Sequence, residues 1–129
     1  VFFFKRAQIF AGDIYGAFEG KGLGALEGVS DLTCFADYRV PQLLSHLKIM
    51  KYSKKLADAI DRKQQIAPGS EEEVAIRAAT IVAVEMMRGM LSKAGKNVTA
   101  VLLDWSLWES GEADLDKLPP HHRTLTIYY

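Results

Sequence analysis

Residues 70–95 constrain the fold more than any other part of the sequence. Ser70 can cap a helix that begins there, and the glutamates at 71–73 place negative charge at the positive end of the helix dipole. Apolar side chains then occur nearly all round the helix from 74 to 94, and Gly95 is a typical residue for its end. A helix of this kind is buried on most sides, so we expect it to be the central helix of a helical core.

The rest of the sequence also favours helices. Apolar spacing, capping residues and Pro41 predict further helices over residues 3–18, 32–38, 41–47, 54–63 and 98–109. The β-branched residues of the last range would also suit a strand, and we choose a helix from its apolar spacing. Gly12 and Gly16 share one face of the first helix, which suggests that a backbone or a ligand packs closely there. Glu85 must be paired, and Arg88 is its expected partner. We therefore expect an all-α fold of five or six helices, forming a single domain.

Composition narrows the class of partner. The 129 residues include 16 Lys plus Arg and 16 Asp plus Glu, so the chain lacks the positive excess of proteins that bind nucleic-acid backbones. We expect a small-molecule or protein partner instead. Cys34 is the only cysteine, which excludes an internal disulfide and favours a reducing, cytoplasmic location. The apolar opening at 1–4 is too short for a signal peptide or a membrane span, and we expect it to pack on another part of a longer protein.

The stretch 34–42 holds the leading candidate site. Because Pro41 disfavours helix at the residue before it, three polar residues are expected at a corner between two helices: Asp37, Tyr38 and Arg39. A carboxylate, a phenol and a guanidinium at a fixed corner can be aimed into a cleft. The alternative is that Asp37 and Arg39 form a surface ion pair beside an ordinary helix break.

Other polar residues are further candidates. Lys5 lies in the first predicted helix with Asp13 about 80° round it, although a solvent-facing lysine is the plainer interpretation. Asp104 stands between apolar residues in the last predicted helix and is a second buried or cleft-facing carboxylate. His122 and Arg123 suit contact with an anion or phosphate. The adjacent histidines lack a third ligand, so we expect neither a metal nor a cofactor.

Five stretches taken together resemble one family. They are KRAQIF at 5–10, FADYRVPQ at 35–42, GSEEEV at 69–74, LDW with LW at 103–108, and PPHHRT at 119–124. The sequence resembles the queuosine salvage protein family, the queuosine 5′-phosphate N-glycosylase/hydrolases, over essentially all of its residues in order. The family's proteins are longer, so the chain is similar to their C-terminal portion. Leu125 and Tyr128 depart from the family's tail, where a basic residue and a phenylalanine are expected.

The resemblance implies a fold and an activity. The fold is similar to helix-hairpin-helix DNA glycosylases, and the activity is hydrolysis of the N-glycosidic bond of queuosine 5′-monophosphate, which releases queuine for salvage into tRNA modification. Asp37 falls on the family's catalytic aspartate and Lys5 on its partner in the pocket. A fixed carboxylate fits this chemistry, because breaking the bond develops positive charge on the sugar. The residues expected to contact the nucleotide are Asp13, Tyr38, Arg39, Asp104, His122 and Arg123.

Two other functions stay open at this point. A DNA or RNA base-excision glycosylase on the same fold would show a basic groove. A non-catalytic helical interaction module would leave Asp37 paired only with Arg39, and a cleft containing both Lys5 and Asp37 would count against it. We expect the full-length protein to be a monomer, and the chain by itself to be helical but inactive or feeble.

Overall fold

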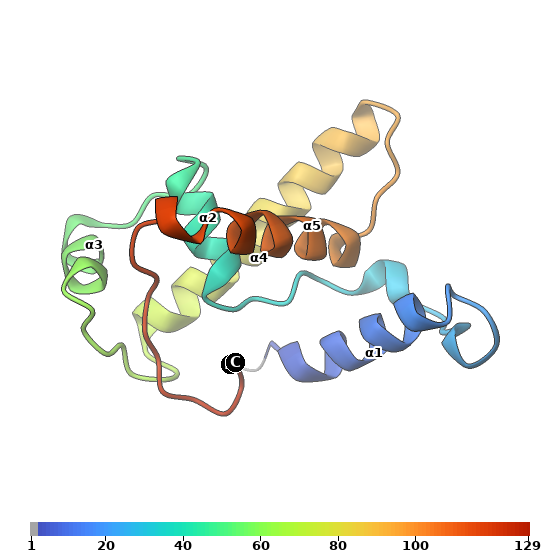
Figure 1. The fold of residues 1–129 in the computed structure, drawn as a ribbon, viewed down its shortest axis with the longest axis horizontal. Coiled ribbons are helices and arrows are strands. Elements are labelled where there is room, and N and C mark those ends of the chain that lie inside the picture. Colours follow the sequence, from blue (N-terminus) through green and yellow to red (C-terminus); the bar gives the residue numbers. More distant parts are fainter. Residues whose placement is uncertain (1–2) are drawn as a thin grey trace.

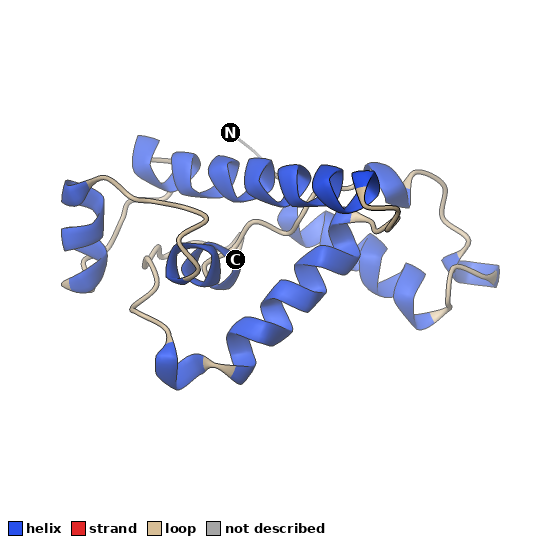
Figure 2. Cartoon of the chain, turned by 90° about the horizontal axis from the view of Figure 1, so that it is seen from above, coloured by secondary structure: helices blue, strands red, loops and turns tan. Residues whose placement is uncertain are grey.

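Residues 3–129 are described by a computed structural model, in which helices are joined by loops and short 3₁₀ turns (Figure 1). The helices are α1 (Lys5–Ala17), α2 (Arg39–His46), α3 (Lys54–Asp61), α4 (Glu71–Lys93) and α5 (Ala100–Ala113). The 3₁₀ turns are Gly22–Gly24, Val29–Asp31 and Leu115–Lys117. The described residues contain helices and loops but no strand (Figure 2), apart from an isolated bridge between Gln65 and Arg123.

The predicted all-α class is therefore confirmed, and the alternative of a strand after residue 98 is wrong. The likeness to helix-hairpin-helix glycosylases stays a prediction. No helix within residues 3–129 is both long and apolar enough to cross a membrane. The expected packing of the apolar opening lies partly outside the described residues, because it includes Val1 and Phe2; within them, Phe4 is 70% exposed.

Three helices enclose the main core. Seen from above, α2 lies between α4 and α5 (Figure 2), and it contacts both. Their buried apolar side chains form one cluster with Cys34: Val40, Leu43, Leu44, Val84, Ala100 and Leu107. At the end of the molecule where α3 lies, Ile60, Ile66 and Ile76 form a second, smaller cluster.

The predicted starts of α3 and α4 are confirmed by their caps, whereas α5 begins at Ala100, two residues later than predicted. The hydroxyl of Ser70 accepts a hydrogen bond from the N–H of Glu73 at 3.3 Å, which closes the first turn of α4. The hydroxyls of Ser53 and Thr99 do the same for α3 and α5. At the other end of α4, Gly95 has a φ of +77°, the left-handed conformation that favours glycine.

The predicted helix over residues 32–38 is wrong. This segment has no regular secondary structure and is called the extended segment below. Two of its N–H groups bond to side chains instead of helical carbonyls: Thr33 N–H donates to Gln8 Oε1 and Phe35 N–H to Asp104 Oδ1, both at 2.8 Å. The next helix begins at Arg39, two residues earlier than predicted, since proline is tolerated within the first turn of a helix.

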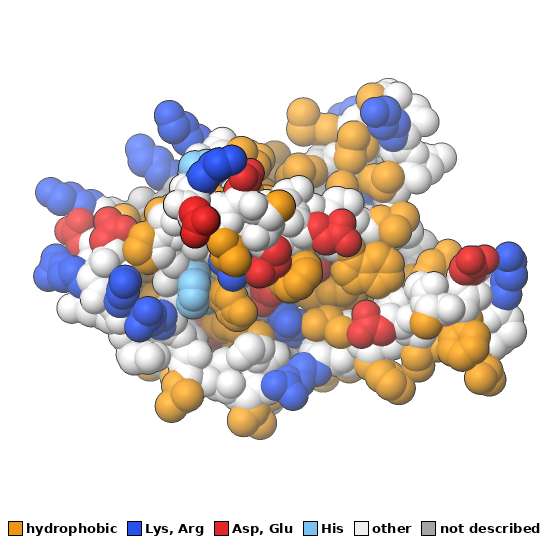
Figure 3. Space-filling model, in the orientation of Figure 1, with side chains coloured by type: hydrophobic (Ala, Val, Ile, Leu, Met, Phe, Trp, Pro, Cys, Tyr) orange, Lys and Arg blue, Asp and Glu red, His pale blue; other side chains and the backbone are white. Residues whose placement is uncertain are grey.

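The prediction that α4 is buried on most sides is also wrong. Three apolar residues on it are more than half exposed: Val82 (57%), Met86 (65%) and Met90 (69%). The last turns of α4 project away from the other helices (Figure 1), and hydrophobic side chains gather on this projecting end (Figure 3). The apolar character of the helix therefore exceeds what the described residues cover.

Aromatic side chains pack against the two glycines of α1. The prediction that a backbone or a ligand packs there is wrong. A Cβ added at Gly16 would lie 2.8 Å from the ring of Trp105 in α5, and one added at Gly12 would lie 3.0 Å from the ring of Phe35. The missing side chains thus let α1 approach α5 and the extended segment closely. This approach brings the beginning of α1 into the neighbourhood of Asp37.

Candidate active site

Asp37 caps the start of α2 with its side chain. Its Oδ1 accepts hydrogen bonds from the backbone N–H groups of Arg39 at 2.9 Å and Val40 at 3.2 Å. The residue is only 7% exposed. Burial raises the pKa of Asp37, while the bond from Val40 and the charge of Lys5 act in the opposite direction. The result is a fixed carboxylate at the beginning of α2.

Lys5, Asp37 and Asp104 form one electrostatic group, although they come from α1, the extended segment and α5. Burial lowers the pKa of Lys5, the two carboxylates raise it, and the neighbouring charges of Arg6 and Arg77 lower it further. Lys5 is half-buried, so its interpretation as a solvent-facing lysine is wrong. The structure thus brings together the two residues to which the family resemblance gives catalytic roles.

Asp104 has the most perturbed carboxyl of the group. It is 4% exposed, and its Oδ1 accepts the Phe35 N–H bond. Burial, helped by the charge of Asp37, raises the pKa of Asp104 to about 7, against the opposing effects of the Phe35 bond and Lys5. A carboxyl with this pKa carries a proton for much of the time at neutral pH, which an ordinary aspartate does not. The group therefore contains both a proton carrier and a fixed anion.

Lys5 also lines a pocket of about 430 Å³. Its other lining residues are mostly apolar: Phe3, Phe4, Arg6, Ala7, Arg77, Ile127 and Tyr128. Asp37 and Asp104 are not among them. Lys5 is therefore the member of the group that connects the two carboxylates to this pocket.

Three of the predicted binding residues line a second hollow, of about 350 Å³: Tyr38, His122 and Arg123. The ring of Tyr38 lies 4.6 Å from that of His121. His122 is 2% exposed, and burial lowers its pKa to about 4, so its imidazole is neutral at neutral pH and a weak partner for an anion. Arg123 is exposed and permanently charged.

The side chains of Arg39 and Asp13 do not join the group around Lys5, although the charge of Arg39 lowers the pKa of Asp37. Arg39 is buried, and its Nε forms an ion pair with Glu112 Oε1 at 2.6 Å, where Gly111 leaves room for the arginine stem. The alternative of a surface ion pair between Asp37 and Arg39 is therefore wrong, because both residues are buried and the guanidinium pairs with α5. Asp13 is exposed, about two turns along α1 from Lys5.

A buried network beside Asp37 was missed at the level of sequence. Arg77 Nε donates to the carbonyl of Ala36 at 3.1 Å, and its Nη1 lies 3.3 Å from Glu73 Oε1. The hydroxyl of Tyr129 donates to the same Glu73 oxygen at 2.8 Å. The spacing of four residues between Glu73 and Arg77 was a visible sign of an ion pair. Nothing in the sequence marked its connection to Ala36 or Tyr129.

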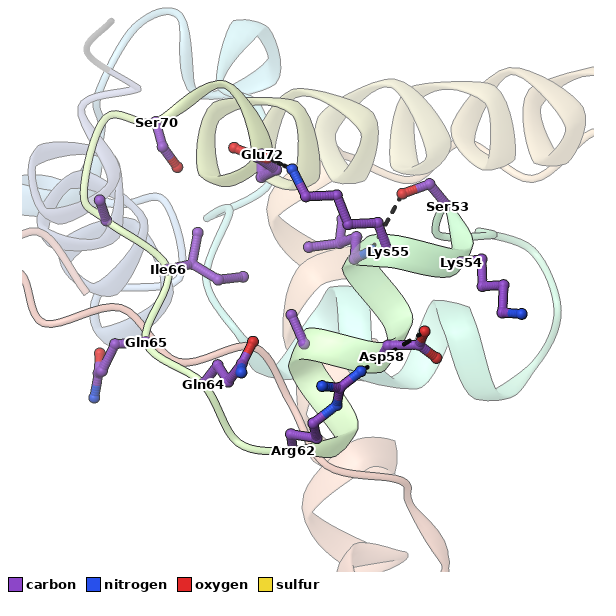
Figure 4. A pocket seen from close by; sticks show the side chains of 13 residues that line it. Ser53, Lys54, Lys55, Asp58, Arg62, Gln64, Gln65, Ile66, Ser70 and Glu72 are labelled. Carbon is purple, nitrogen blue, oxygen red and sulfur yellow. Dashed lines mark hydrogen bonds and ion pairs between the residues drawn. The ribbon is translucent and has the colours of Figure 1, made fainter.

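A larger hollow lies elsewhere, between α3 and the start of α4 (Figure 4). It measures about 690 Å³, and four of its charged side chains form two ion pairs: Lys55 with Glu72 at 3.6 Å, and Arg62 with Asp58 at 4.0 Å. None of the predicted site residues lines it. Within residues 3–129, no group of three or more His, Cys, Asp or Glu side chains could hold a metal ion.

Comparison with known proteins identifies the family. The family described as "Queuosine salvage protein" matches residues 1–129. The chain is 55% identical to the queuosine 5′-phosphate N-glycosylase/hydrolase of Dictyostelium discoideum, 49% to that of Sphaerobacter thermophilus and 39% to that of Mus musculus. These alignments cover 100%, 98% and 98% of this chain but only 40%, 39% and 40% of the relatives, so the chain spans about two-fifths of their length. The chain belongs to the queuosine salvage protein family.

Proposed function

We propose that this chain supplies catalytic residues for hydrolysis of the N-glycosidic bond of queuosine 5′-monophosphate, with release of queuine. The observation that carries the proposal is the group of Lys5, Asp37 and Asp104 in a chain of this family. Because the chain spans about two-fifths of its relatives, the activity is assigned to the full-length protein. A cytoplasmic location and a monomeric full-length protein belong to the same proposal.

The roles follow from the reaction. As the bond between the base and C1′ breaks, positive charge develops on the ribose, and water then supplies the new C1′–O bond to give ribose 5-phosphate. Asp37 is the fixed anion that stabilises this charge, because it is held by two N–H groups and lies near Lys5. The departing base gains a proton, and Asp104 is the group whose pKa suits its delivery. The attacking water loses a proton as its oxygen bonds to C1′, and this proton restores the protonated form of Asp104.

The remaining nucleotide contacts are assigned by position. Tyr38 and Arg123 share one hollow, and Tyr38 directly follows Asp37 in the chain. An exposed guanidinium suits a phosphate, so Arg123 is our candidate for the 5′-phosphate, with His122 as a neutral wall of the same hollow. Arg39 and Asp13 have no such support, because Arg39 is engaged with Glu112 and Asp13 is remote from the group.

No observation favours the other two functions. The chain has equal numbers of basic and acidic residues, as expected for an enzyme of a free nucleotide rather than of DNA or RNA. An interaction module in which Asp37 serves only as the partner of Arg39 does not fit the Arg39–Glu112 ion pair.

The test is Asp37→Asn in the full-length protein, with queuine release from queuosine 5′-monophosphate and nucleotide binding measured separately. Asparagine keeps an oxygen that can cap α2 but removes the charge. We expect turnover to fall by about a hundredfold or more with affinity nearly unchanged, because the charge acts mainly in the transition state. Lys5→Met should instead damage binding and turnover together.

Asp13→Asn is the matched control, since it makes the same change at an exposed carboxylate of the same chain. It should leave both quantities unchanged. An Asp37→Asn protein that turns over within a few-fold of the parent would overturn the assignment and make Asp104 the leading candidate. The isolated chain should release queuine far more slowly than the full-length protein, and equal rates would refute that expectation.

A further inference from the structure

Three consecutive residues of the extended segment are each held by a different helix. Phe35 is held by Asp104 of α5, and Asp37 is held by the N–H groups of α2. Between them, the carbonyl of Ala36 accepts the bond from Arg77 of α4. The proposed reaction gives roles to Asp37 and Asp104 but none to Arg77.

Arg77 is itself tightly held. Its side chain is 5% exposed, and a buried guanidinium needs compensation for the loss of hydration. The carboxylate of Glu73 supplies the opposite charge, and the ring centroids of Phe3 and Tyr129 both lie 4.6 Å from its Cζ. The guanidinium is therefore fixed by charge and by two aromatic rings, with Nε left to bond to Ala36.

The carboxylate of Glu73 is held in turn. The hydroxyl of Tyr129 donates to its Oε1 at 2.8 Å, and His122 Nε2 lies 3.2 Å from the same hydroxyl. The other oxygen, Oε2, accepts the N–H of Gly69 at 3.1 Å. A chain of contacts thus runs from the tail of the sequence through α4 to the peptide group that precedes Asp37.

We propose that Arg77 is a positioning residue for the proposed reaction: by holding the Ala36 carbonyl it sets where Asp37 lies relative to Lys5, while Glu73 and Tyr129 fix Arg77. The catalytic part of this inference rests on the proposed function, whereas the structural part does not. The carbonyl of Ala36 belongs to the peptide group that leads into Asp37, so a rotation there displaces the aspartate. Its capping bonds tie Asp37 to α2 only, and Lys5 comes from α1. A displacement of about 1 Å at a reacting group can cost about a hundredfold in rate.

The first experiment needs no activity. Cys34 is the only cysteine of these 129 residues, lies two residues before Ala36 and is 1% exposed, and burial raises the pKa of its thiol. The full-length protein is used, with every cysteine outside these residues replaced by serine. The reaction of Cys34 with an aromatic disulfide reagent therefore measures opening of the segment. In Arg77→Lys, which keeps the charge but cannot reproduce the planar set of bonds, we expect labelling about tenfold faster or more, as for loss of a hydrogen bond to a charged group.

Two controls separate local opening from general destabilisation. Arg88→Lys makes the same change in a partly exposed pair of α4 and should label at the parent rate. Ile60→Val weakens the second core cluster, away from Cys34, and should accelerate labelling only through global unfolding, which rises steeply with urea. The labelling of Arg77→Lys should instead be insensitive to dilute urea, because a local opening exposes little surface.

The second experiment tests catalysis in the full-length protein. Arg77→Lys should lower kcat about tenfold or more with KM within about twofold of the parent value. It should also move the acid limb of the kcat profile to higher pH, because the lowering effect of Lys5 on the pKa of Asp37 weakens when the two separate. If part of the variant protein were simply unfolded, the measured kcat would fall but the acid limb of the pH profile would stay in place. Tyr129→Phe keeps the ring and loses the hydroxyl, so it should show the same changes in kcat and in its pH profile to a smaller extent. It replaces Arg77→Lys as the test variant if Arg77→Lys does not fold.

The outcomes are distinct. Parent-rate labelling of Arg77→Lys and Tyr129→Phe, or acceleration that follows urea as in Ile60→Val, overturns the positioning role. So does faster labelling with kcat and its pH profile unchanged. If the parent protein releases no queuine, the proposed function fails, and the labelling result still decides whether Arg77 holds the segment.

Discussion

The two parts of α4 differ more than their sequences suggest. The inner part, residues 71–84, contains every buried residue of the helix, and the outer part, residues 85–93, contains none. Each part has one ion pair between glutamate and arginine. The pair in the outer part is the shorter, at 2.7 Å against 3.3 Å, but its side chains are 33–41% exposed, whereas those of the inner pair are 4–5% exposed.

This comparison shows that neither apolar content nor ion-pair distance decides what a helix contributes. The inner part faces α2, α5 and the extended segment, so its polar side chains are desolvated and must be matched by partners. Met87 in the outer part still packs against the main core, but the last turns project beyond these elements, and the charges of Glu85 and Arg88 stay partly hydrated (Figure 1). Matched substitutions in the two parts can break or sharpen this distinction.

The largest difference is expected between the two ion pairs. Glu73→Ala leaves the Arg77 guanidinium buried without its carboxylate and should lower the free energy of unfolding by about 3–5 kcal/mol. Glu85→Ala removes the partner of Arg88 at a partly exposed site and should cost less than about 1 kcal/mol. Urea denaturation of the two variants measures both values. Similar losses would show that the two pairs are equally desolvated.

A smaller difference is expected between two valines that lie two residues apart. Val84 is completely buried in the main core, whereas Val82 is 57% exposed. Val84→Ala should cost about 2 kcal/mol, because it removes two buried methyl groups and leaves a cavity. Val82→Ala should change the free energy of unfolding by less than about 0.5 kcal/mol. A large loss at Val82 would mean that this face is covered in solution.

The smallest difference concerns the two ends of the helix. Ser70→Ala removes the hydroxyl that accepts the Glu73 N–H and should lower the free energy of unfolding by about 1 kcal/mol. Ser92→Ala makes the same change in the exposed last turn, where alanine is the better helix former, and should have an effect within about 0.5 kcal/mol of zero. Thermal melts in which Ser70→Ala matched the parent would show that the cap contributes nothing.

Sequence reasoning succeeded where the deciding contact is local. The caps of α3, α4 and α5 join residues three apart, so the hydroxyl and its partner can be read together. The helix predicted over residues 32–38 is wrong because the deciding contacts there are not local. Its N–H groups bond to Gln8 and Asp104, which lie 25 and 69 residues away, and no local pattern signals such partners.

The candidate site shows the same division. Asp37 was singled out by its place before Pro41, but the catalytic roles of Asp37 and Lys5 came from the family resemblance, which supplies information that spacing does not. The bond from Arg77 to Ala36 spans 41 residues and that from Tyr129 to Glu73 spans 56, so neither could be predicted from periodicity. Burial of the outer part of α4 was overestimated for a related reason: an apolar face shows that contact with a partner is favourable, but not which residues provide it.

The ring of Trp105 packs against Gly12 and Gly16 of α1, the helix that carries Lys5. The fluorescence of Trp105 therefore reports on the position of this helix. Indole emission depends on how much water surrounds the ring, and here the ring lies against the bare backbone of α1. A change in the packing of α1 against α5 therefore shifts the emission wavelength of Trp105. The other tryptophan of these 129 residues, Trp108, is 44% exposed and can be replaced by phenylalanine, which leaves Trp105 as the one indole of this part of the protein. Movement of Lys5 relative to the two carboxylates can then be followed in real time as a nucleotide binds.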